Sequence, residues 1–204
     1  MKKELSFIFD IGRVLVDFDL DIALKRLTNY SAYDYVRIER NIFKLVDGVD
    51  IMDEYELGKI DSLSFYKEIK KRAALDMDYD TFVKVWSDIF TENIRISKML
   101  ESICDYPKVI VSNINPMHWE AVSKFSNINK YFAENRCIKS YEVGLRKPDA
   151  KIYEIARDIL PDDVEILYFD DSIEYIKEAS KMNIKGVKYD CRVDDIKKIL
   201  KAIA

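Results

Sequence analysis

The sequence has 204 residues, of which 49% are hydrophobic and 34% are charged, and its formal net charge is −4. This length suits one domain, or a core domain with a smaller insert, and the composition predicts a folded chain. The mildly acidic balance argues against general binding to nucleic acid. Three widely separated cysteines and a single histidine exclude a disulfide framework and a cysteine- or histidine-rich metal site.

Neither an export signal nor a membrane span is expected. The basic start at residues 1–3 precedes an apolar run that breaks at Asp10, and no small-residue cleavage site follows. No apolar stretch approaches the roughly 18 residues that a membrane-spanning helix needs. We therefore expect a cytoplasmic protein, monomeric or weakly homodimeric, without nucleic-acid or membrane partners.

Four short apolar runs predict the strands of a parallel sheet. They cover residues 5–9, 108–111, 165–169 and 186–189. Near-continuous apolar runs suit strands that are buried on both faces. Because ligands bind beyond the carboxyl ends of such strands, we expect the residues that follow the first three runs to share one edge. These residues are Asp10, Ser112, Asp170 and Asp171.

The stretch between the first two strands is predicted to be helical. Four segments have the pattern of a helix: 21–30, 35–45, 61–74 and 79–90. In the last two, apolar residues recur at helical spacing, with Asp61 or Ser62 and Asp80 as the expected N-caps. We find no convincing strand between residues 18 and 95.

The C-terminal part is expected to alternate helices with the last two strands. Its helices are predicted at 149–159, 173–182 and 193–203. The fold class is therefore α/β, with a three-layer, Rossmann-like parallel sheet core and an inserted small helical cap. Residues 1–17 and 96–204 would form the core, and residues 18–95 the cap.

The ends of the first two strands carry groups suited to chemistry. Asp10, followed by a turn at Gly12, would present a carboxylate on rigid backbone, as a nucleophile or a metal ligand. The alternative is a carboxylate that caps the turn. Ser112 and Asn113 offer a hydroxyl and an amide that can hold phosphate oxygens, although both residue types are also common in turns.

Two further segments add a cation and a pair of acids. Pro148 stands where a helix is expected to begin, which fixes the approach of Lys147, and this ammonium can neutralise a carboxylate nucleophile and a phosphoryl group. The adjacent acids Asp170 and Asp171 repel each other and need a cation such as Mg²⁺. The alternative for this pair is a helix N-cap with a first-turn acid.

In this order the four segments resemble the haloacid dehalogenase-like (HAD) superfamily of phosphatases. The resemblance extends from Phe7 to about Val187. Within that superfamily the chain is similar to the subgroup with a helical cap after the first motif, which includes bacterial alpha-D-glucose-1-phosphate phosphatases. The shared segments are FDIGRV at 9–14, SNINPMH at 112–118, GLRKP at 144–148 and FDD at 169–171.

The resemblance implies an Mg²⁺-dependent phosphatase that acts on small phosphorylated metabolites, with glucose 1-phosphate-like sugar phosphates as the expected substrates. Asp10 would form an aspartyl-phosphate, Ser112 would bind the phosphoryl group and Lys147 would stabilise its charge. The implied metal ligands are Asp10, the Gly12 carbonyl, Asp170 and Asp171. The implied substrate-binding residues are Gly12, Asn113, Asn115 and His118. The helical insert would close over the substrate and exclude water.

Two positions depart from the superfamily pattern. Gly12 stands where most of these phosphatases have an aspartate that acts as general acid and base, so the leaving group lacks its usual proton donor. An anomeric sugar phosphate suits this arrangement, because a hemiacetal oxygen leaves more readily than an ordinary alkoxide. The similar subgroup shares this glycine. Tyr175 stands where many members have another acid.

The single histidine, His118, lies six residues after Ser112. We hypothesise that it faces the substrate and contacts a hydroxyl of the leaving group. The alternative is a histidine at a helix start near the interface with the cap.

Three other functions stay open. A 2-haloacid dehalogenase also lacks the acid at the Gly12 position, and it would need no metal and would use a cap arginine, Arg37 or Arg40. The adjacent acids after the third strand argue against this function, because they would repel a carboxylate substrate. A non-catalytic binding or regulatory protein on the same scaffold is the second alternative. Phosphoryl transfer to an acceptor other than water is a further one.

Overall fold

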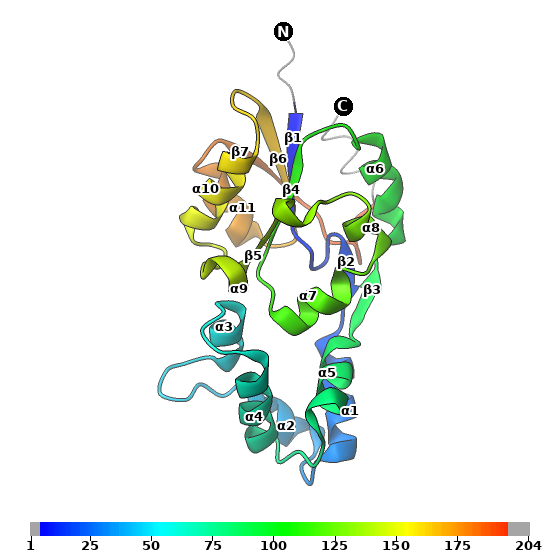
Figure 1. Ribbon diagram of the computed structural model, residues 1–204, viewed down its shortest axis with the longest axis vertical. Coiled ribbons are helices and arrows are strands. Elements are labelled where there is room, and N and C mark those ends of the chain that lie inside the picture. The colour runs from blue at the N-terminus through cyan, green and yellow to red at the C-terminus, as the bar shows by residue number, and fades with distance from the viewer. Residues whose placement is uncertain (1–4, 196–204) are drawn as a thin grey trace.

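A computed structural model of the chain describes residues 5–195. Its central sheet has five parallel strands in the order β5-β4-β1-β6-β7 (Figure 1). The strands are β1 Leu5–Phe9, β4 Lys108–Ser112, β5 Cys137–Lys139, β6 Glu165–Asp170 and β7 Ile184–Lys188. Because β1 lies between β4 and β6, the carboxyl ends of these three strands are neighbours at one edge. The predicted parallel α/β sheet is confirmed.

Helices cover both faces of the sheet. One face packs against α10 (Ala150–Ile159) and α11 (Ile173–Ser180), and the other against α6 (Ser97–Ser102), α7 (Pro116–Val122) and α8 (Ser126–Asn129). Alternate residues of each strand serve the two faces. In β1, Ile8 packs on the first face, and Phe7 and Phe9 pack on the second.

The helical segment between β1 and β4 has a hydrophobic core of its own. Its helices are α1 Leu20–Leu27, α2 Tyr35–Ile42, α3 Ile51–Glu56, α4 Ser62–Arg72 and α5 Tyr79–Ser87. The aromatic residues Tyr55, Phe65, Phe82 and Trp86 are buried in this core, and Met117 of α7 packs into it. In Figure 1 these helices lie beyond the end of the sheet toward which β1 runs, so they face the edge that carries Asp10.

An aspartate caps the N-terminus of every one of these five helices. Each carboxylate accepts a hydrogen bond from a backbone N–H of the first turn, which satisfies a donor that the helix itself leaves unpaired. The caps are Asp19, Asp34, Asp50, Asp61 and Asp78. For α5 the predicted cap, Asp80, is wrong, because Asp78 accepts from the N–H of Thr81 at 2.7 Å and Asp80 lies inside the helix.

Three short elements escaped prediction. An antiparallel pair, β2 (Val16–Phe18) and β3 (Phe90–Glu92), joins the two ends of the helical segment, so the expectation of no strand between residues 18 and 95 is wrong. Neither strand has a run of apolar residues long enough to be recognised. β5 was missed because it has only three residues and ends at a lysine, Lys139. That buried ammonium pairs with Glu142 at 2.7 Å.

The C-terminal part follows the predicted alternation. Asp149 caps α10, so Pro148 lies just before the cap instead of inside the first turn. The last strand begins at Ile184, two residues before the predicted start. Most of the helix predicted at 193–203 lies outside the described residues. Among residues 5–195, no helix combines the length and the apolar character needed to cross a membrane.

Candidate active site

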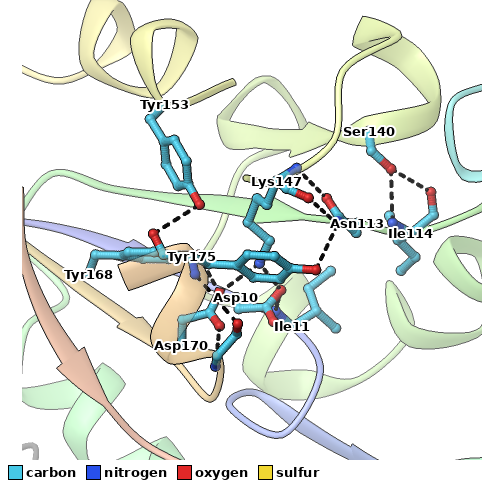
Figure 2. A network of polar contacts seen from close by, with 11 residues as sticks. Asp10, Ile11, Asn113, Ile114, Ser140, Lys147, Tyr153, Tyr168, Asp170 and Tyr175 are labelled. Carbon is cyan, nitrogen blue, oxygen red and sulfur yellow. Dashed lines mark hydrogen bonds and ion pairs between the residues drawn. The ribbon is translucent and has the colours of Figure 1, made fainter. Parts of the chain in front are cut away.

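Three of the side chains predicted to carry the chemistry, Asp10, Lys147 and Asp170, meet at the carboxyl edge of the sheet (Figure 2). Lys147 Nζ lies 2.9 Å from Asp10 Oδ1 and 2.7 Å from Asp170 Oδ2. Ser112 ends the neighbouring strand β4, and its side chain lies close enough to Asp10 to lower the pKa of that carboxyl. All four side chains are buried. Three neighbouring strands and the loop before α10 therefore bring a carboxylate, a hydroxyl and an ammonium into one contact.

Asn113 fixes the position of Lys147. Its Oδ1 accepts the Lys147 backbone N–H at 2.8 Å, and its Nδ2 donates to the Lys147 carbonyl at 3.0 Å. Asn113 Nδ2 also lies 3.4 Å from the Tyr175 hydroxyl. The Tyr175 ring lies 5.0 Å from the ammonium, so this tyrosine covers Lys147.

Asp10, Asp170 and Asp171 form an acidic cluster in which one carboxylate oxygen from each lies within 4.8 Å of the other two. Asp170 already accepts hydrogen bonds from Lys147, from the Tyr168 hydroxyl and, at 2.7 Å, from the backbone N–H of Ser172. Asp171 is only partly buried. Three convergent carboxylates suit a hard cation such as Mg²⁺, and the two with the freer oxygens are Asp10 and Asp171.

Burial governs the charges of this cluster. It raises the pKa of Asp10 to about 7, although Lys147 acts in the opposite direction. Burial alone would lower the pKa of Lys147, but Asp10 and Asp170 together raise it above its ordinary value. Burial and the charge of Asp170 raise the pKa of Asp171. The site therefore holds more negative charge than one lysine balances, which favours an additional cation.

A cavity of about 150 Å³ lies beside Ile11 and Gly12, the two residues that follow Asp10, although none of the three acids lines it. Gly12, Ser112 and Asn113 line it from the core, and residues of the helical segment and β3 line the opposite side. That side is apolar except for one carboxylate. Its residues are Leu20, Met52, Glu56, Ile89 and Phe90.

Phe18 fills the space next to Gly12. A Cβ atom at Gly12 would lie 3.0 Å from the Phe18 ring, closer than an ordinary contact. The Arg13 guanidinium covers this ring at 4.1 Å from its centre and is paired with Asp17. The Phe18 ring therefore occupies the space that a side chain at position 12 would need.

Asn115 and His118 bind each other. Asn115 caps α7 by accepting the His118 backbone N–H at 3.0 Å, so its Nδ2 donates to His118 Nδ1, also at 3.0 Å. His118 Nε2 then carries the proton and donates to the Trp86 carbonyl at 3.3 Å. His118 lines the cavity, whereas Asn115 does not. The role of both in substrate binding stays a prediction, and their observed contacts join α7 to α5.

Two residues near the site were not singled out from the sequence. Arg146, next to Lys147, forms ion pairs with Asp53 and, at 2.8 Å, with Glu56 of α3. Gly58, just beyond α3, has φ +68° and lies against Tyr141 so closely that a Cβ would be 2.1 Å from the Tyr141 carbonyl oxygen. The helical segment and the core are therefore joined beside the cavity by charge and by close backbone packing.

The arginines considered for a dehalogenase lie elsewhere. Arg37 and Arg40 are exposed on α2, and neither lines the cavity. Arg37 stacks on Tyr33, with its guanidinium carbon 3.6 Å from the ring centre.

No protein-family profile matches the sequence. Over 190 residues the chain is 25% identical to D-ribitol-5-phosphate phosphatase of Bacteroides thetaiotaomicron, which covers 88% of this chain and 89% of that enzyme. A crystal structure of a HAD family enzyme from the same organism superposes with a TM-score of 0.80 at 21% identity, over 97% of this chain and 99% of that one.

The same HAD family enzyme in complex with magnesium and inorganic phosphate gives a TM-score of 0.77 at 20% identity, over 94% of this chain and 96% of that one. The chain therefore has the fold of the HAD-superfamily hydrolases, as the sequence resemblance implied. The finer resemblance to glucose-1-phosphate phosphatases is not confirmed, because the curated relative is named for another phosphate ester.

Proposed function

We propose that this protein is an Mg²⁺-dependent phosphatase that hydrolyses small phosphomonoesters through an aspartyl-phosphate on Asp10. One observation carries the proposal: the Asp10 carboxylate lies at the end of the central strand, 2.9 Å from Lys147 Nζ and beside two further acids. A nucleophile, a fixed cation and a metal-binding acid cluster are the parts that phosphoryl transfer requires.

Each of the core residues has a separate role in the proposed reaction. Asp10 attacks phosphorus, while the Ser112 hydroxyl and Lys147 Nζ hold the phosphoryl oxygens. Asn113 keeps Lys147 in place through its two hydrogen bonds to the lysine backbone. Because Lys147 is buried between Asp10 and Asp170, water screens its charge little, so the ammonium can offset negative charge on the nucleophile and on the phosphoryl group.

Asp10, Asp171 and the Gly12 carbonyl would hold the metal, with Asp170 as a supporting residue. This division follows from the contacts of Asp170, whose oxygens accept from Lys147, Tyr168 and Ser172. Bound Mg²⁺ supplies positive charge that neutralises the phosphoryl oxygens and orients them.

The organic part of the substrate is proposed to be a small sugar or sugar alcohol. The size of the cavity supports a small group, and the curated relative is named for D-ribitol 5-phosphate. Glucose 1-phosphate and similar anomeric phosphates stay in the proposal because of Gly12. The helical segment 18–95 would act as the cap, since its residues line the side of the cavity that faces the leaving group.

The test is phosphate release from sugar phosphates, sugar-alcohol phosphates, nucleotides and p-nitrophenyl phosphate, with Mg²⁺ or with EDTA. The native protein is compared with Asp10→Asn. We expect turnover that needs both Mg²⁺ and Asp10. Absence of turnover even of the aryl ester would overturn the proposal and would point to a binding protein, and release of halide from haloacids without metal would point to a dehalogenase.

A further inference from the structure

The proposed phosphatase has a glycine at position 12 and therefore no proton donor there. A side chain at this position would also be crowded by Phe18. The Phe18 ring lies 3.0 Å from the position that a Cβ atom would occupy at Gly12. An ordinary alkyl phosphate releases an alkoxide, which must gain a proton as the P–O bond breaks. The donor must therefore come from another part of the cavity.

Of the described residues that line this cavity, two have titratable side chains, His118 and Glu56. His118 is unsuited to the task. Its Nδ1 accepts from Asn115 and its Nε2–H donates to the Trp86 carbonyl, so neither nitrogen is directed to a ligand. Burial also lowers its pKa to about 4, which keeps the ring neutral.

Glu56 has the opposite properties. It ends α3 and lines the same cavity as Gly12 and Ser112, with a side chain that is 17% exposed. Its Oε2 forms an ion pair with Arg146 at 2.8 Å, and no other donor contacts the carboxylate among the described residues. The charged groups around it are Arg146 on the core and Asp50 and Asp53 on its own side. Burial raises the pKa of Glu56 against the opposing charge of Arg146.

We propose that Glu56 is the general acid and base of this site, supplied by the helical segment in place of the residue missing at position 12. The inference rests on the proposed phosphatase function. Asp10 Oδ forms a bond to phosphorus, the P–O ester bond breaks, and its electron pair stays on the ester oxygen, which takes the proton of Glu56. Water then attacks the phosphorus of the aspartyl-phosphate and gives a proton to the Glu56 carboxylate. The bond between phosphorus and the Asp10 oxygen breaks, phosphate is released, and Asp10 is again a carboxylate and Glu56 again protonated.

This assignment extends the range of substrates. A phosphatase with an acid at Glu56 accepts esters of ordinary alcohols, including primary esters of sugar alcohols, and is not limited to anomeric phosphates. The acid is in place only when α3 lies against the core. Arg146 bonds Glu56 and immediately precedes Lys147, so the contact that docks α3 also positions the proton donor.

The experiment compares Glu56→Gln with native protein on p-nitrophenyl phosphate, phenyl phosphate and an alkyl phosphate such as D-ribitol 5-phosphate. Glutamine keeps the shape and the contact with Arg146 but cannot transfer a proton. We expect the ratio of kcat/KM for the alkyl ester to that for p-nitrophenyl phosphate to fall about 100-fold, in the range of general acid catalysis. Phenyl phosphate should give an intermediate loss.

Asp53→Asn is the matched control, because it removes the other carboxylate partner of Arg146 without changing a residue of the cavity lining. It should leave the ratio of the two rates within about 3-fold of the native value, far less than the loss expected from a missing general acid. Equal losses of Glu56→Gln on all three esters would overturn the inference and leave the phosphatase intact. No Mg²⁺-dependent turnover of any ester by native protein would overturn both proposals.

Discussion

Neighbouring aspartates in this site have different surroundings, and these surroundings assign them different tasks. Asp170 is fully buried and held by Lys147, Tyr168 and a backbone N–H. Asp171 is partly buried, and the nearby negative charge of Asp170 opposes its ionisation. We therefore expect a substitution of Asp170 to lower the stability of the protein and a substitution of Asp171 to weaken Mg²⁺ binding.

Asp171→Asn should weaken Mg²⁺ binding while leaving the metal-free Tm close to that of native protein, because the change removes a repelling charge. Asp170→Asn should lower the stability by about 3–5 kcal/mol, the usual effect of breaking a buried ion pair. Calorimetric titration with Mg²⁺ and thermal unfolding with EDTA check the two outcomes. A native-like Tm for Asp170→Asn would contradict the assigned roles.

His118 predicts a dependence of stability on pH. Burial lowers its pKa to about 4 in the folded protein, against about 6.5 for an ordinary histidine. Between these values the unfolded chain binds more protons, so the contribution of His118 is complete above pH 6.5 and is lost as the pH falls toward 4. Each pH unit in that window represents up to about 1.4 kcal/mol.

Urea unfolding of native protein and His118→Gln at pH 7 and pH 5 tests this dependence. The native protein should lose more stability than the variant between the two pH values, because glutamine does not titrate. The comparison cancels the effects of the acids, which are common to both proteins. Equal losses would show that His118 is not a source of acid sensitivity.

At the scale of elements, the segment from β1 to β2 has a glycine at position 12, and the Phe18 ring occupies the space beside it. Gly12 lies on the turn after β1, and Phe18 ends β2 with its ring over that turn. The Arg13 guanidinium lies over the same ring, 4.1 Å from its centre. The two positions are coupled, so a substitution at one depends on the other.

Gly12→Asp alone should be destabilising by about 1–3 kcal/mol, the usual effect of overpacking, because the new side chain meets the Phe18 ring. Gly12→Asp combined with Phe18→Ala should recover part of that loss, measured against Phe18→Ala alone in a double-mutant cycle of unfolding free energies. Additive changes would mean that Phe18 does not restrict position 12.

The elements differ in how far they could be predicted. Asp10, Ser112 and Asp170 could be placed together because each follows a buried strand, and parallel strands end at a shared edge. Glu56 and Arg146 could not, because their contact depends on how α3 docks against the core, which no local pattern encodes. Tyr168 was overlooked although it lies two residues before Asp170, on the same face of the strand.

At the scale of the whole molecule, the helical segment contacts the core on two sides of the cavity. On one side α7 contributes Met117 to the core of the helical segment and His118 to a bond with Trp86. On the other side Arg146 binds α3, and Gly58 lies against Tyr141. The first contact is largely buried, whereas the second depends on charge, so the α3 side should separate more easily.

Arg146→Met tests this asymmetry. Without the guanidinium, α3 should exchange its amide hydrogens faster than native protein, and KM for a turned-over phosphate ester should rise. The amides of α7 and of the central strands should keep their native exchange rates. Hydrogen exchange followed by mass spectrometry resolves these segments, and equally faster exchange throughout would indicate general destabilisation instead of separation at α3.

The two-sided construction of the cavity has a consequence for redesign. The proposed phosphoryl-binding side comes from strand ends that are fixed by the packing of the sheet, whereas Leu20, Met52 and Ile89 line the cavity from the helical segment. A library limited to these three positions would vary the shape offered to the alcohol and leave the reaction centre intact. New specificities are thus accessible without rebuilding the catalyst.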